Sequence, residues 1–292
     1  MNEALLKTVK YVLPAVKIDM DGFPVKQALP TNKVKQVDPF LLLHHAKAKF
    51  NKNRLAKHQG VGPHPHRGFS PVTFIVEGEV RHRDSWGHDQ IATAGEVQWM
   101  HAGAGIIHSE RPSEELVKSS GRQEIIQLWI NSPSSAKMQP PEYTFLSKDS
   151  MPIYSSNDKK IKTKVVAGNY FQQKGKVIPK SELVVLWSYG EEGGIENYAI
   201  PKNHNCTLYL IKGRLNLVGY GLVESEQLIV FELSGERIEL ILKQDSQFLI
   251  LSGKPLDEKV TQHGPYVMNT QTEVLEAMRD YKMGKMGILI EV

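Results

Sequence analysis

Short strand-like runs fill two blocks of this chain, residues 71–131 and 183–253. The runs are rich in β-branched and aromatic residues, and Gly, Pro, Asn or Asp separates them. They are VTFIV, EVRHRD, EVQWM and EIIQLWIN in the first block, and LVVLWSY, TLYLI, RLNLVG, QLIVFEL, RIELIL and QFLILSG in the second. Turn signals spaced by roughly 8 to 12 residues are typical of antiparallel sandwiches and barrels, whereas a parallel sheet needs helices between its strands. The pattern predicts an all-β protein with two antiparallel barrels.

An internal repeat supports the count of two barrels. Residues 72–80 (VTFIVEGEV) and 207–215 (TLYLIKGRL) share a five-residue apolar strand, a charged-Gly turn and a resumed strand. With 292 residues, 40% of them hydrophobic, the chain is long enough for two domains with real cores. The polar, Pro- and Ser-rich residues 131–160 are the expected connection. We therefore expect an N-terminal barrel over residues 1–150 and a C-terminal barrel over residues 151–292.

One amphipathic helix is expected near the C-terminus. In QTEVLEAMRDYKMG, the residues Val274, Ala277, Met278 and Tyr281 recur at helical spacing and a Gly follows them. This helix belongs to the second expected domain, and we expect it to pack on a barrel.

Composition and charge indicate which kinds of partner and which cellular location to expect. The formal net charge is +4, but Lys and Arg are scattered and largely balanced by acids, so no direct nucleic-acid binding is expected. Cys206 is the only cysteine, which excludes an intramolecular disulfide and a Cys-rich zinc site. Charged residues and prolines interrupt the first thirty residues before any apolar run reaches signal-peptide or membrane-spanning length. We expect no membrane association and a cytoplasmic location, or a nuclear one if the source has a nucleus.

Histidines cluster in the first block. Seven of the eleven histidines lie between His58 and His108. Residues two apart in a strand point to the same face, so His64 and His66 can project into one barrel if Pro65 stands at the strand entry. Pro65 also restricts His64 to extended backbone conformations. This spacing favours a pair of metal-binding imidazoles.

A second pair follows a Gly-rich turn, where His108 and Glu110 again stand two apart. Three neutral imidazoles and one carboxylate, with water in the remaining positions, suit a divalent ion such as Fe(II), Mn(II), Ni(II) or Cu(II). A closed structural zinc site more often uses thiolates. Single pairs of this kind occur by chance in strands, but two pairs in one predicted barrel favour a metal site formed by His64, His66, His108 and Glu110.

The other candidate residues are interpreted more conservatively. His82 can orient a ligand or meet a substrate, but a partly exposed strand position is the preferred interpretation. His44, His45, His58 and His88 are expected to face solvent. A place at the mouth of the barrel is the less favoured interpretation of His101. Gln127 and Trp129 share one strand face, and Trp129 is expected in the core. Cys206 is expected to be a small buried hydrophobe.

Several blocks of the chain resemble the pirin family of bicupins: PHPHRGF, EGEVRHRDSWG, GEVQWMHAGAGIIHSERP, IQLWIN and QHGPYVMNT. The resemblance covers most of the chain, from about Asp38 to the C-terminal helix. It implies two cupin barrels of the jelly-roll type. It also implies one metal ion in the N-terminal barrel, held by His64, His66, His108 and Glu110 and typically Fe(II), with Mn, Ni, Cu or Zn as alternatives.

The resemblance implies two functions of different classes. Family members are similar to quercetin 2,3-dioxygenases in fold and site, and some cleave flavonols with O₂. In that role the substrates are O₂ and a flavonol such as quercetin, and Glu110 takes the 3-hydroxyl proton as general base. Other members are nuclear transcriptional cofactors, which implies an iron-dependent, redox-responsive binding protein that regulates transcription or a metabolic enzyme through a protein partner. A third interpretation, an inert scaffold, is disfavoured by the four paired metal-type residues.

The sequence departs from the family pattern at two places. Ser70 and Pro71 stand where the family usually has Glu-Thr, and His101 stands where Thr is usual. The first departure removes a carboxylate from the barrel strand and the second adds an imidazole. We expect both to alter the pocket without touching the four proposed ligands.

Overall fold

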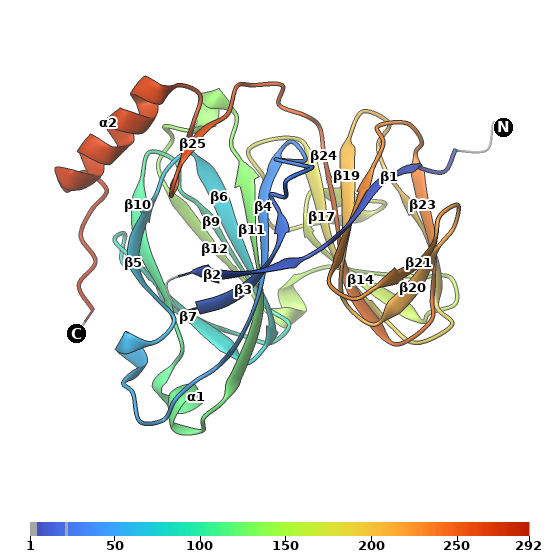
Figure 1. The fold of residues 1–292 in the computed structure, drawn as a ribbon, viewed down its shortest axis with the longest axis horizontal. Coiled ribbons are helices and arrows are strands. Elements are labelled where there is room, and N and C mark those ends of the chain that lie inside the picture. The colour runs from blue at the N-terminus through green and yellow to red at the C-terminus, as the bar shows by residue number, and fades with distance from the viewer. Residues whose placement is uncertain (1–4, 21–22, 292) are drawn as a thin grey trace. The chain divides into compact units, whose positions relative to one another are not determined.

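The computed structural model describes residues 5–20 and 23–291 and divides the chain into two compact units. Unit 1 comprises residues 1–16, 28–40 and 149–256, and unit 2 comprises residues 17–27, 41–148 and 257–292. Each unit contains one seven-stranded and one four-stranded sheet (Figure 1). The predicted all-β class with two domains is therefore confirmed.

The strands of unit 1 are β1 (Val9–Pro14), β13 (Ile153–Ser155), β14 (Ile161–Ala167), β15 (Asn169–Tyr170), β16 (Gln173–Lys174), β17 (Leu183–Gly190), β18 (Ile195–Ala199), β19 (Asn205–Lys212), β20 (Arg214–Leu217), β21 (Gly221–Glu224), β22 (Gln227–Phe231), β23 (Arg237–Leu242) and β24 (Ser246–Gly253). The remaining strands form unit 2, apart from one or two residues at its boundaries: β2 (Val16–Met20), β3 (Phe23–Leu29), β4 (Phe40–Lys49), β5 (Val61–His66), β6 (Phe69–Glu77), β7 (Glu79–Asp84), β8 (Asp89–Thr93), β9 (Val97–His101), β10 (Ile106–Arg111), β11 (Arg122–Asn131), β12 (Glu142–Leu146), β25 (Thr261–His263) and β26 (Tyr266–Met268). The helices are α1 (Glu114–Lys118) and α2 (Gln271–Lys282), with short 3-10 turns η1 (Ala56–His58), η2 (Ser134–Ala136) and η3 (Lys148–Ser150). No helix in this described part of the chain is long and apolar enough to span a bilayer.

The two units repeat one strand order. The large sheet runs β1-β22-β19-β24-β17-β14-β13 in unit 1 and β12-β9-β6-β11-β4-β3-β2 in unit 2, and the small sheet runs β18-β23-β20-β21 and β5-β10-β7-β8. β19 and β6 occupy the same place, as the sequence repeat predicted. Gly78 and Gly213 end these strands with positive φ angles of 74° and 92°, a conformation that a tight turn requires and glycine adopts without strain. The glycine recurs in both repeats because the backbone of the turn requires a positive φ angle at this position.

The first strand and the C-terminal helix do not belong to the domains in which the sequence division placed them. The chain passes from unit 2 to unit 1 between residues 148 and 149, close to the expected boundary. However, β1 pairs with β22 of unit 1, whereas α2 belongs to unit 2 and packs on β25 and β26. Within the expected linker, β12 pairs with β9 and takes the place in unit 2 that β1 takes in unit 1. The unit to which each of these segments belongs is decided by contacts with residues far away in the sequence. The local composition of a segment carries little information about such contacts.

The predicted C-terminal helix is confirmed as α2, which lies beside β10 and β25 in Figure 1. Thr270 and Glu273 form a capping box that satisfies the first backbone donors. Val274 and Ala277 are fully buried, as their spacing predicted. Asp280, also among the buried residues of α2, accepts a hydrogen bond of 3.1 Å from Arg67, which follows β5. This contact anchors the helix beside the strand that carries His64 and His66.

The interiors of the units differ in polarity. Unit 1 contains a continuous apolar cluster in which Cys206, Tyr198 and Phe248 are all buried. The predicted buried position of Cys206 is thus confirmed, and burial raises the pKa of its thiol to about 12. Unit 2 buries several imidazoles, among them His66, His82 and His108. Buried histidines are costly unless they are paired or bound, so this interior is where chemistry is expected.

The solvent exposure expected for two histidines of β4 is wrong. His44 and His45 are 8% and 1% exposed, because β4 lies between β11 and β3 in the large sheet. His44 Nε2 lies 2.9 Å from Gln27 Oε1, and His45 Nε2 lies 2.7 Å from Glu124 Oε1. Burial lowers the pKa of His44 to about 4.

We expect the free energy of unfolding to fall between pH 7 and pH 5 in part because of His44. An unfolded chain takes up the His44 proton near pH 6.5, whereas the folded chain does so only near pH 4, so stability is full above 6.5 and decreases as the pH falls toward 4. The linkage amounts to about 2 kcal/mol between pH 7 and 5. Urea titrations of wild type and His44→Gln at both pH values measure it. Equal pH dependence in the two proteins would contradict the assignment.

Candidate metal centre

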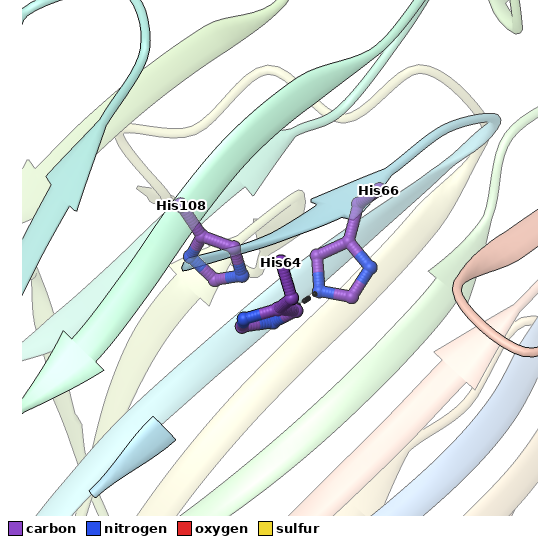
Figure 2. Close-up of side chains that lie close together, drawn as sticks. All are labelled: His64, His66 and His108. Atoms are coloured by element: carbon purple, nitrogen blue, oxygen red, sulfur yellow. Dashed lines mark hydrogen bonds between the residues drawn. The ribbon is translucent and has the colours of Figure 1, made fainter. Parts of the chain in front are cut away.

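Two neighbouring strands of the small sheet in unit 2 carry the candidate ligands. β5 pairs antiparallel with β10 so that His64 lies opposite His108 and His66 lies opposite Ile106. β5 is the edge strand of this sheet, which tolerates Pro65 because a missing N–H at an edge breaks no ladder. The three imidazoles therefore gather on one face, as Figure 2 shows.

The three rings are close enough to share one ion. One nitrogen of each of His64, His66 and His108 lies within 4.8 Å of the others. His66 and His108 are 4% and 2% exposed, and His64 is half-buried. Burial is the main cause that lowers the pKa of all three imidazoles, and it takes those of His66 and His108 well below their ordinary value. The rings are therefore neutral at neutral pH and carry the lone pairs that a metal requires.

Hydrogen bonds leave suitable nitrogens free. His64 Nδ1 lies 2.8 Å from the carbonyl oxygen of Gly62, which can only accept, so the proton is on Nδ1 and the lone pair is on Nε2. That Nε2 lies 3.1 Å from His66 Nε2. His108 Nε2 is buried and has no hydrogen-bond partner among the residues that the structure describes. An orphaned buried nitrogen beside two facing imidazoles fits a transition metal ion.

Glu110 lies two residues beyond His108 on β10, with an irregularity in the strand pairing between them. Its Oε1 accepts a hydrogen bond of 2.7 Å from the Thr73 hydroxyl, and its Oε2 accepts one of 2.8 Å from Gln127 Nε2. Each carboxylate oxygen keeps a second lone pair. The group of three histidines could hold a metal, and Glu110 as a fourth ligand stays a prediction.

An aromatic pair borders the histidines. Phe69 and Trp129 have ring centroids 4.3 Å apart, and those of Trp129 and His66 are 5.3 Å apart. Trp129 is partly buried: it packs against the apolar cluster of Leu41, Phe69 and Val267, and it also lies beside the candidate site. Gln127 and Trp129 do share one strand face, because both contact residues of this site. Thr73 and Gln127 were not predicted as partners of Glu110. The alternation of side chains along β6 and β11 indicates only which strand face each of them occupies.

The partly exposed strand position predicted for His82 is wrong. His82 is 2% exposed, and its Nδ1 lies 3.3 Å from His108 Nδ1. Its other nitrogen contacts Asp84, and Tyr143 stacks on its ring at 4.3 Å. His58 is exposed as predicted, and His88 has a side chain that is 41% exposed. Asp84 and Tyr143 were missed, although the His82/Asp84 spacing of two in a strand was a usable signal.

The two departures from the family pattern meet each other away from the site. His101 is 2% exposed and its Nδ1 lies 3.3 Å from Ser70 Oγ. Its Nε2 lies 3.2 Å from the backbone oxygen of Ala136. Ser70 alternates along β6 with Phe69, which contacts His66, so Ser70 points to the opposite face of the strand. His101 does not line the mouth, and this pair does not alter the pocket directly.

Comparisons with known proteins agree with this geometry. A family model described as pirin matches residues 22–130, and the model of the pirin C-terminal cupin domain matches residues 165–287. The chain belongs to the pirin family. The predicted family and the predicted bicupin fold of this pirin-family protein are thereby confirmed.

Three relatives illustrate the similarity. The chain is 39% identical over 267 residues to a Pseudomonas aeruginosa protein named "Putative quercetin 2,3-dioxygenase", with 91% of this chain and 92% of the relative covered. It is 34% identical over 285 residues to Pirin-1 of Arabidopsis thaliana, with 96% and 94% covered. It is also similar to the crystal structure of quercetin 2,3-dioxygenase from Acinetobacter baumannii, at 33% identity and a TM-score of 0.89, with 98% of this chain and 100% of that chain covered.

Proposed function

We propose that this pirin-family protein is a metal-dependent dioxygenase that cleaves a flavonol such as quercetin with O₂. The observation that carries the proposal is the group of three neutral imidazoles, two of them buried, with the Glu110 carboxylate two residues from His108 on β10. Two of the relatives described above bear the name of this activity. Flavonols are planar and aromatic, which suits the rings of Phe69 and Trp129 beside the histidines.

In this proposal His64, His66, His108 and Glu110 hold one divalent ion, Fe(II) before Mn, Ni, Cu or Zn. When bound, such an ion supplies Lewis acidity and access to O₂ chemistry. Nitrogen and carboxylate donors suit all of these metals, so the donor set supports a transition metal without selecting one.

Glu110 then has the second role of general base. Thr73 and Gln127 orient its carboxylate through one hydrogen bond to each oxygen, and the remaining lone pairs can accept a proton. Removal of the 3-hydroxyl proton converts a flavonol into an enolate, which is electron-rich at the bond that O₂ cleaves. The apolar wall of Phe69 and Trp129 limits water around that anion.

The experiment is elemental analysis of the purified protein, followed by anaerobic titration with quercetin and admission of air. We expect about one transition metal ion per chain, a shift of the quercetin absorption band on binding, and O₂ uptake in step with quercetin loss. Protein stripped with a chelator is the control, and it should bind and oxidise little quercetin. Absence of O₂ uptake after loading with Fe(II), Mn(II), Ni(II) and Cu(II) in turn would overturn the proposal and favour the redox-responsive binding protein.

A further inference from the structure

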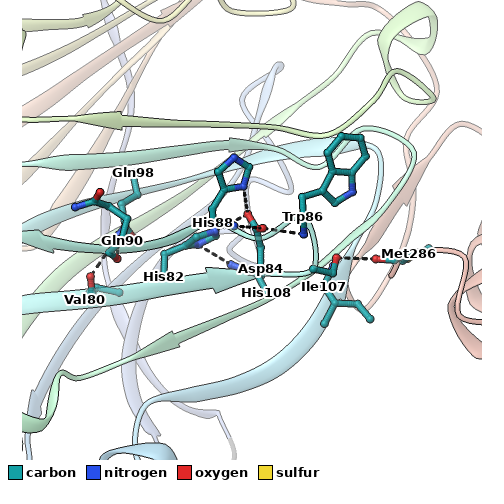
Figure 3. Close-up of polar contacts among 11 residues, drawn as sticks. Val80, His82, Asp84, Trp86, His88, Gln90, Gln98, Ile107, His108 and Met286 are labelled. Carbon is teal, nitrogen blue, oxygen red and sulfur yellow. Dashed lines mark hydrogen bonds and ion pairs between the residues drawn. The ribbon is translucent and has the colours of Figure 1, made fainter. Parts of the chain in front are cut away.

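A buried series of polar contacts lies behind His108 and is not explained by ligand positions alone. His108 Nδ1 lies 3.3 Å from His82 Nδ1, and His82 Nε2 lies 3.0 Å from Asp84 Oδ2 (Figure 3). His88 Nδ1 contacts the same Asp84 oxygen at 2.8 Å. His82, Asp84 and His108 are each no more than 3% exposed. These three side chains are therefore shielded from bulk solvent.

The protons in the series can be assigned from chemistry. Burial tends to raise the pKa of Asp84, but hydrogen bonds from His82 and His88 outweigh it and hold that pKa below its ordinary value. An ionised carboxylate only accepts, so His82 Nε2 carries a proton. Nδ1 of a neutral His82 is then an acceptor, and the facing His108 Nδ1 must donate. This leaves the lone pair of His108 on Nε2, the buried nitrogen that lacks a partner among the described residues.

Two further contacts hold the series in this orientation. Asp84 Oδ1 accepts the backbone N–H groups of Trp86 and His88, at 2.9 and 3.1 Å, which fixes the carboxylate in the turn between β7 and β8. The Tyr143 ring stacks on His82 with an angle of 15° between the planes. Rotation of the imidazole would break both the stack and the contact with Asp84.

We propose that Asp84 and His82 are positioning residues that fix the tautomer of His108, so that its Nε2 lone pair faces the metal. The proposal rests on the proposed metal centre for its purpose, but not on any dioxygenase activity. Partners that orient a metal-binding histidine typically change metal affinity by about 10 to 100-fold when they are lost. Asp84 and His82 should therefore control metal affinity through the position of the proton on the His108 ring. This position can be observed in metal-free protein.

Asp84→Asn tests the proposal because it keeps the shape of the side chain but replaces one hydrogen-bond acceptor, a carboxylate oxygen, by a donor, the NH₂ group. The Asn oxygen can still accept the amides of the turn, which places its NH₂ group against His82 Nε2. His82 Nε2 must then accept, His82 Nδ1 donates to His108 Nδ1, and the His108 proton moves to Nε2. Long-range ¹H–¹⁵N spectra of metal-free, ¹⁵N-histidine-labelled protein distinguish the two tautomers. We expect Nδ1–H for His108 in wild type and Nε2–H in the variant.

The second readout is affinity for Co(II), measured by competition with a chelator. We expect Asp84→Asn to lower it by about 10 to 100-fold. His82→Phe, which keeps the stack on Tyr143 but removes the acceptor, should lower it by a similar factor. His58→Gln is the matched control, because His58 is an exposed imidazole of the same unit that lies outside the series, and it should change affinity by no more than about twofold.

Each outcome decides the matter. An Nε2-protonated His108 in wild type would overturn the proposal, as would an unchanged tautomer in Asp84→Asn. A loss of Co(II) affinity in His58→Gln equal to that in Asp84→Asn would show that the effect does not depend on the series and would also overturn it. If the tautomers behave as expected while quercetin is not oxidised, the positioning role stands and only the proposed activity fails.

Discussion

Replacing His108 by Ala is expected to lower the affinity for a divalent transition metal by about one to two orders of magnitude or more. Loss of a residue that merely orients a metal-binding histidine costs about 10 to 100-fold, and loss of the ligand itself matters at least as much. His64→Ala should have a similar effect, because the His64 ring centroid lies 4.4 Å from that of His108. Competition of Co(II) between protein and a chelator measures the affinity, and elemental analysis of the purified variants measures occupancy.

The control for this experiment is His58→Ala, which removes an exposed imidazole from the same unit. It should bind metal as wild type does. A circular dichroism spectrum and a melting curve for each protein separate loss of a ligand from loss of the fold. Full metal occupancy in both His64→Ala and His108→Ala would remove the metal centre from this group.

The paired spacing of the candidate ligands could be predicted because side chains in a strand alternate with period two. His64 and His66, and likewise His108 and Glu110, had to share a face once each segment was assigned to a strand. That β5 and β10 are neighbours was a further guess, and the observed pairing of His64 with His108 supports it. Local periodicity therefore predicted the three histidines that the structure brings together.

Residues contributed by other strands were less accessible to sequence reasoning. Tyr143 lies on β12, inside a segment expected to be a polar connection, and it reaches His82 only because β12 pairs with β9. Thr73 and Gln127 meet Glu110 from the other sheet of the same unit. No local pattern indicates which strand of one sheet faces which strand of the other. For the same reason the preferred exposed position for His82 was wrong.

The N-terminal strands show the same limit at longer range. His45 on β4 was expected in solvent, yet its partner Glu124 lies 79 positions later in the sequence, on the neighbouring strand β11. β1 (VKYVLP) pairs with β22, more than two hundred positions away. Both strands are defined by their partners more than by their own composition.

Replacing Glu110 by Gln is expected to lower flavonol turnover by about 10² to 10⁴-fold or more at matched metal content, the usual contribution of a general base. The neutral amide is nearly isosteric, so the fold and part of the metal affinity should remain. Thr73 and Gln127 can adapt, since the Gln127 amide can turn its oxygen toward the new NH₂ group. What the amide cannot do is accept the 3-hydroxyl proton. Oxygen uptake with quercetin measures the loss.

Glu114→Gln is the matched control for this last experiment, because the same chemical change falls on a side chain that is 74% exposed and pairs with Lys118. It should oxidise quercetin at the wild-type rate. Quercetin binding by Glu110→Gln under nitrogen separates the two roles of Glu110. A variant that binds metal and quercetin but consumes no O₂ has lost the base, whereas one that binds neither has lost a ligand. Equal turnover by Glu110→Gln and wild type would remove Glu110 from the proton transfer, and a residue other than this carboxylate would have to accept the proton.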